Sequence, residues 1–253
     1  MSPFITTLFM LAFVFGGILL GLWLQKILPG QLLTTETKDI VGRSTAVIAT
    51  ISAIVLGLLV SSAKDNFTRF DDELTQNTAR VIMLDRILSE YGPQTDNIRA
   101  LIKSSYARRI ELLFSNNIAT KNTIDSLHAI AQEENIDSKL FALTPVSSVQ
   151  QGLQARAIEM NSEINMTRTL IHLQREDSIP IELIMVLGTW LSLIFTTFGL
   201  FAPRNTIAIA ALLACAISIA GATLLILEMN SPFAGLIRIS SAPMYEALLY
   251  LGR

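Results

Sequence analysis

The chain has little charge and almost no cysteine. Charged residues make up 16% of its 253 residues, whereas soluble domains average about 25%. Together with 51% apolar residues and a mean hydropathy of +0.50, this deficit indicates a membrane protein. The single cysteine, Cys215, excludes an intramolecular disulfide and a cysteine-rich metal site. A net charge of -2 argues against the clustered basic surface that nucleic-acid binding needs.

Four apolar runs contain no Asp, Glu, Lys, Arg or His: residues 4–24, 44–63, 183–202 and 206–227. The hydrocarbon core of a bilayer, ~30 Å thick, is crossed by about 20 helical residues, and each run is long enough. We therefore predict four transmembrane helices. Ionisable groups inside a membrane are the usual mark of proton relays, ion-coupled carriers and voltage sensors, so their absence argues against all three.

The connections between these runs predict an all-α membrane protein made of two helical hairpins. Residues 203–205 leave room only for a tight turn, whereas more than a hundred residues separate the second run from the third. We expect a helical cytoplasmic domain, residues 64–180, inserted between transmembrane hairpins at residues 1–63 and 181–227 and followed by a tail at 228–253. A small excess of Lys and Arg near the membrane on the insert side predicts that the insert and both termini are cytoplasmic.

The most regular pattern follows the second apolar run. Residues recur there at intervals of three and four, which is the heptad pattern of a coiled coil. No helix breaker interrupts it, so we predict one continuous helix from Ser44 to Tyr91, roughly 70 Å long at 1.5 Å per residue. Asn77, a polar residue within the pattern, fits either the core of an oligomer or packing against residues 147–176 of the same chain. We call this pattern the seam: Phe67, Phe70, Leu74, Asn77, Val81, Leu84 and Leu88.

Within the second run, small residues share one helix face. We call it the small face: Ala46, Thr50, Ala53, Gly57 and Ser61. Two interpretations stay open, because such a face suits a narrow aqueous path and is also typical of close helix packing in membranes. We name Thr50, Ala53, Gly57 and Ser61 as candidate pore-lining residues. Gly17 and Gly21 have the GxxxG spacing and favour packing more strongly.

No pattern of catalytic or metal-binding residues is recognisable. The two histidines, His128 and His172, are far apart, and His172 with Glu176 is best explained as a solvated helical pair. We therefore expect neither an enzyme, nor a cofactor, nor a metal site.

Residues 227–240 read LEMNSPFAGLIRIS. This segment resembles the tail motif of a bacterial integral-membrane family of unknown function described as bestrophin-like, as does the plan of four spans with a helical insert. Pro232, Phe233 and Gly235 match the centre of the motif, and their residue types also suit a simple structural turn. One departure concerns an early Glu-Ala pair of that family, which matches Asn77 and Thr78 here.

Bestrophins are homo-oligomeric ion channels, largely pentameric, whose second helices surround the pore. The resemblance thus implies a homo-oligomer, a pentamer by analogy, in a bacterial inner membrane, with inorganic ions and the lipid bilayer as its partners. The leading hypothesis is passive ion permeation near the second helix. The alternative is a non-conducting, membrane-anchored scaffold whose helical insert recruits a partner.

Overall fold

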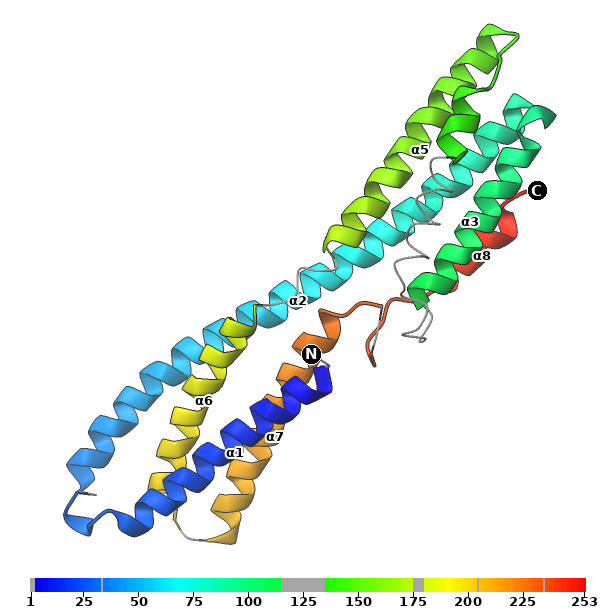
Figure 1. The fold of residues 1–253 in the computed structure, drawn as a ribbon. Coiled ribbons are helices and arrows are strands. Elements are labelled where there is room, and N and C mark those ends of the chain that lie inside the picture. Colours follow the sequence, from blue (N-terminus) through cyan, green and yellow to red (C-terminus); the bar gives the residue numbers. More distant parts are fainter. Residues whose placement is uncertain (1–2, 33, 115–134, 175–179, 204, 234) are drawn as a thin grey trace. The chain divides into compact units, whose positions relative to one another are not determined.

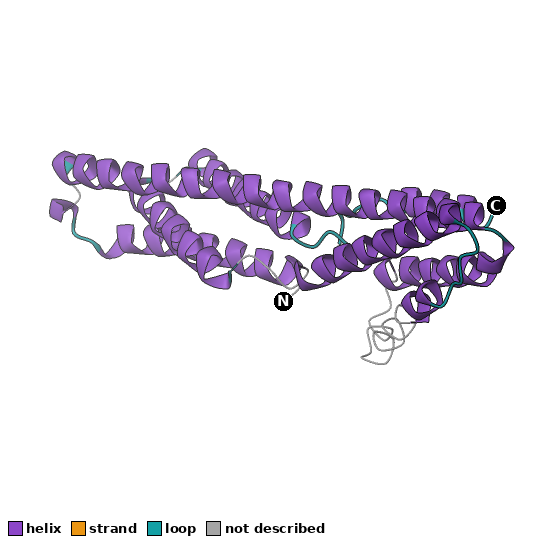
Figure 2. Ribbon diagram, turned by 90° about the horizontal axis from the view of Figure 1, so that it is seen from above, coloured by secondary structure: helices purple, strands orange, loops and turns teal. Residues whose placement is uncertain are grey.

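The computed structural model describes residues 3–32, 34–114, 135–174, 180–203, 205–233 and 235–253. These residues are mostly helical and contain no β-strand (Figures 1 and 2). The predicted all-α class is therefore confirmed. The principal helices are α1 (Pro3–Ile27), α2 (Thr35–Tyr91), α3 (Asp96–Phe114), α5 (Ser148–Gln174), α6 (Ile181–Phe201), α7 (Thr206–Met229) and α8 (Ala242–Tyr250).

Four of these helices, α1, α2, α6 and α7, are long and apolar enough to cross a bilayer, as predicted. The prediction of one helix through Ser44 to Tyr91 is also confirmed, but α2 begins earlier, at Thr35. The Thr34 hydroxyl accepts a hydrogen bond from the Thr37 N–H at 3.2 Å and caps this end. Polar residues can continue a helix outside the hydrocarbon, which is why apolarity alone missed its first turns. The hairpin arrangement and the cytoplasmic side of the insert stay predictions.

The chain divides into two compact units, and α2 contributes to both. The membrane unit consists of Met1–Phe67, Ser178–Ser231 and Gly235–Ile237, and the helical unit consists of Thr68–Asp177, Pro232–Ala234 and Arg238–Arg253.

The core of the membrane unit forms where α1 packs against α6 and α7. Glycine makes this close approach possible: a Cβ on Gly17 would lie 2.6 Å from the Ser192 carbonyl oxygen, and one on Gly199 would lie 2.6 Å from that of Ile18. The structure therefore places the Gly17–Gly21 pair in helix packing, as its spacing favoured. The buried residues of this core are Met10, Val14, Ile18, Ile184, Leu187, Leu191, Ile194, Phe195 and Ala216.

All of the seam after Phe67 lies in the core of the helical unit. Its residues from Phe70 to Leu88 are all buried, and Phe67 is half-buried. Polar contacts join α2 to both neighbours: the Tyr106 hydroxyl of α3 is 2.8 Å from the Thr78 hydroxyl, and Arg80 pairs with Glu163 of α5 at 3.1 Å. Packing within one chain therefore accounts for the heptad pattern without a second copy. Burial raises the pKa of Tyr106.

Asn77 is buried within this core, and its side-chain oxygen has no hydrogen-bond partner among the described residues. A buried polar atom without a partner carries an uncompensated desolvation cost. Asn77→Leu should therefore raise the free energy of unfolding in detergent by about 1–2 kcal/mol, measured by denaturant titration, and leave the oligomer mass unchanged. A lower stability would contradict the uncompensated oxygen, and an altered mass would assign Asn77 to an interface between copies.

Candidate functional site

The small face of α2 lies open on the surface of the chain. Ala46, Thr50, Ala53, Gly57 and Ser61 are all exposed, and no described atom lies within 4 Å of where a Cβ on Gly57 would be. Gly17 and Gly199 are in the opposite situation, since carbonyl oxygens of the facing helix fill that space. The described part of the chain therefore does not use the small face for its own helix packing.

The opposite side of α2 is the side that packs. Thr45, Ser52 and Ala63 are buried, and Leu56 and Leu59 pack against the core of the membrane unit. In the apolar 18-residue stretch of α2, only 11% of the residues are buried, compared with 22–39% in the corresponding stretches of the other three apolar helices. More of α2 than of any other spanning helix is thus left for lipid or another copy of the chain to cover.

The chemistry offered by the small face is weakly polar and uncharged. The Thr50 hydroxyl donates to the Ala46 carbonyl at 2.9 Å, so its hydrogen is satisfied inside the helix while its oxygen remains on the open face. Side chains of this size allow a neighbouring helix or a solute to approach the helix backbone closely. The described residues contain no group of three or more potential metal ligands. Such a face suits weak, transient contact with ions better than tight binding.

The tail motif folds around a buried carboxylate at the end of α7. Glu228 is almost fully buried, and one of its oxygens accepts hydrogen bonds from the backbone N–H groups of Leu236 and Ile237. Gly235 has φ +98°, and a Cβ there would collide with the Glu228 carboxylate. The positive φ favours glycine at position 235, and the carboxylate gives a second reason for glycine there.

Phe233, two residues before that glycine, anchors the motif in the helical unit. Its ring makes edge-to-face contacts with Phe70 and Phe114, each with ring centroids 6.1 Å apart. The Pro232 carbonyl accepts a hydrogen bond from the Ile239 N–H at 2.9 Å. Pro232, Phe233 and Gly235 therefore act in the described structure as parts of a turn.

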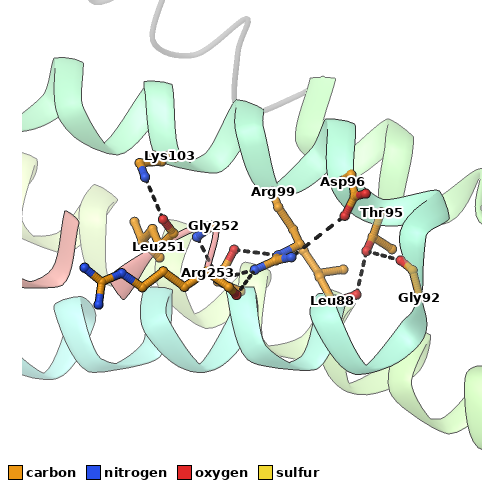
Figure 3. A network of polar contacts seen from close by, with 10 residues as sticks. Leu88, Gly92, Thr95, Asp96, Arg99, Lys103, Leu251, Gly252 and Arg253 are labelled. Carbon is orange, nitrogen blue, oxygen red and sulfur yellow. Dashed lines mark hydrogen bonds and ion pairs between the residues drawn. The ribbon is translucent and has the colours of Figure 1, made fainter. Parts of the chain in front are cut away.

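A polar network that the sequence did not reveal joins α2, α3 and the residues after α8 (Figure 3). Asp85 is buried and accepts two hydrogen bonds from Arg99, from Nε at 2.9 Å and from Nη2 at 3.0 Å. It also accepts the Gly252 N–H at 3.1 Å. The hydrogen bond with Asp85 raises the pKa of Arg99. In the sequence, the network is visible only as two opposite charges, Asp85 and Arg99, on either side of Gly92-Pro93, where α2 ends.

Comparison with known proteins identifies the type of domain. The family model described as a Bestrophin-like domain matches residues 12–244, which include α2, α6, α7, the tail motif and α1 from residue 12 onward. No curated protein and no solved structure matches the chain.

Gly235→Ala tests the construction of the tail motif. The new methyl group would meet the Glu228 carboxylate, and alanine disfavours a positive φ. We expect a loss of about 2 kcal/mol or more in the free energy of unfolding in detergent. Gly221→Ala is the matched control, since nothing lies within 4 Å of its Cβ position in α7, and its effect should stay below about 1 kcal/mol. Equal stability of the two variants would contradict this account.

Proposed function

The chain belongs to the Bestrophin-like family, and on that premise we propose that it assembles as a homo-oligomer and conducts inorganic ions passively along a central path beside α2. The open small face of α2 is the observation that carries this proposal. Bestrophin channels, to which the family is named as similar, surround their pore with second helices. By the same analogy we propose a pentamer in a bacterial inner membrane, with the helical unit on the cytoplasmic side.

The shape of the face supports an axial position. Helices in contact have axes about 8–10 Å apart, so residues with short side chains on the inner face leave space at the centre of a ring. Larger exposed residues, Val47, Ile54 and Leu58, lie beside the small face and offer surface for a neighbouring copy. A lone α2 facing lipid would gain little from hydroxyl groups on that face.

The absence of charge in the four apolar sequence runs fits a passive path. Ion-coupled carriers and proton relays place ionisable groups within the membrane. We accordingly propose permeation down an electrochemical gradient, without an enzymatic step and without a cofactor.

The second candidate is a membrane-anchored scaffold. The helical unit has large exposed apolar side chains at Phe141, Val146 and Val149, with exposed fractions of 67%, 87% and 70%. A protein partner would shield such residues from water. An assembled oligomer that carries no current but retains a partner through these residues would favour this candidate.

Gly57→Leu tests the conducting path. In liposomes or planar bilayers under a salt gradient, the unmodified oligomer should carry current, and leucine at position 57 should reduce it by at least about tenfold, because a ring of such side chains narrows and dewets the path. Gly221→Leu is the matched control, since its Cβ position in α7 is equally open, and it should conduct normally.

Oligomer mass has to be measured for both variants, so that a failure of assembly is distinguished from a block. Normal current in assembled Gly57→Leu would exclude α2 from the path. Absence of current from a correctly assembled unmodified oligomer would reject conduction itself.

The net charge of the region between the second and third spans predicts which sign of ion the path prefers. Residues 64–180 contain 13 Lys and Arg and 16 Asp and Glu, a net charge of -3 per copy. A vestibule built from them would raise the local concentration of cations. We expect the reversal potential in a KCl gradient to have the sign of a cation preference, which should weaken at high salt because of screening. The opposite sign would show that the path is not lined by the acidic side of this region.

A further inference from the structure

Helix α8 rests on the helical unit by one apolar face. Met244, Ala247 and Leu251 are nearly fully buried, with exposed fractions of 3%, 1% and 0%, and α8 packs against α3. Figure 1 shows the short helix alongside α3. Neither the seam nor the small face includes these residues, so α8 is a separate structural feature.

The outward face of α8 has large apolar and aromatic side chains around one charged residue. Tyr245, Leu249 and Tyr250 have exposed fractions of 51%, 64% and 60%. Glu246 is the only charged residue in the helix. A helix with large apolar side chains on both faces and a single charge suits the boundary between lipid and water. The docked position of α8 buries one of these faces and leaves the outward tyrosines and Leu249 in contact with water.

The residues after α8 are held through their main chain. Lys103 Nζ donates to the Leu251 carbonyl at 2.7 Å, and Arg99 Nη2 donates to the Arg253 oxygen at 2.8 Å. The Gly252 N–H donates to Asp85 (Figure 3). Asp85 and Arg99 also bind each other, so two of the three tail contacts end on one ion pair between α2 and α3.

We propose that α8 with Leu251–Arg253 is a strap that exchanges between its docked position on α3 and the lipid surface of the bilayer. On release, the buried and exposed apolar faces of α8 both need an apolar environment, and the bilayer that holds α7 supplies one. Tyrosines are favoured at the boundary between lipid and water. Arg238, which precedes the helix, suits anionic headgroups.

The chain length permits this exchange. The apolar helix α7 ends at Met229, and α8 begins at Ala242. The intervening residues 230–241 could span at most about 40 Å even if the turn around Glu228 were pulled straight. A released α8, itself roughly 13 Å long, therefore stays attached to the membrane by a short connection. This makes lipid the apolar phase that is always within reach, whereas a soluble partner has to be recruited.

Gly252→Pro is the variant that tests the strap. Proline removes the N–H that binds Asp85 and does not adopt the observed φ of +78° at position 252. The Asp85–Arg99 pair lies on α2 and α3, so it is retained. Arg253→Ala is the matched control, because it removes a side chain of the same segment and keeps the main-chain oxygen that Arg99 binds.

The readout is fluorescence from position 249. In a Cys215→Ala background, Leu249→Cys is labelled with an environment-sensitive dye, and the full chain is reconstituted in vesicles of zwitterionic lipid with or without anionic lipid. A lipid with a spin label at the level of its headgroup then quenches the dye wherever position 249 contacts the membrane surface. We expect Gly252→Pro to increase the ratio of released to docked α8 by about tenfold, the effect of losing a hydrogen bond to a charged group. Quenching by lipid should rise accordingly, most with anionic lipid, while Arg253→Ala behaves like the unmodified tail.

Three results would overturn the proposal. Equal quenching in Gly252→Pro and Arg253→Ala would show that the main-chain contacts do not control α8. A shift of the dye to a watery environment without lipid quenching would show release without lipid binding. The third result combines two samples. If the labelled protein shows no quenching by lipid, and the unlabelled Leu249→Cys protein forms a disulfide between two copies under mild oxidation, the outward face belongs to a contact with a second copy. None of these measurements requires ion current, so the test is independent of conduction.

Discussion

The unbroken backbone of α2 is the constraint on which the rest of the structure depends. One helix, Thr35–Tyr91, supplies one side of the core in each unit. Its period of 3.6 residues means that the positions used for packing determine which positions remain outside. Ser52 and Ala63 pack in the membrane unit, and Gly57 is left open. In the helical unit the seam packs, so residues such as Arg86 remain on the surface. The exposed small face is thus a consequence of the packing.

Much of this arrangement could be predicted from the sequence because it depends on patterns that are local along the chain. Uncharged runs predicted the four apolar helices, and the heptad spacing predicted both a continuous helix and a buried seam. The residue types of the tail motif likewise suited a turn, and Gly235 has the positive φ that favours glycine. In each case the physical cause, hydrophobic burial or backbone sterics, acts within a few residues and is visible in the order of residue types.

The remainder could not be predicted because it depends on contacts between distant residues. Gly17 and Gly57 are the same residue type in similar apolar runs, yet one meets a neighbouring carbonyl oxygen and the other meets nothing within 4 Å. Only the facing helix decides between these two environments. The network of Asp85 was hidden for a similar reason, since it binds the main chain of Gly252 and main-chain atoms leave no signature in the choice of side chains. The role of Glu228 became clear only with the turn folded around it.

The pair formed by Thr78 and Tyr106 has a consequence for how such sequences diverge. Thr78 donates its only hydroxyl hydrogen to the Leu74 carbonyl, so Tyr106 has to donate to the Thr78 oxygen. Both hydroxyls are deep in the core, and alanine at position 78, the residue typical of the bestrophin-like pattern, would leave that of Tyr106 without its acceptor. Positions 78 and 106 should therefore covary: lineages with alanine at 78 should favour phenylalanine at 106, or introduce a new acceptor beside it.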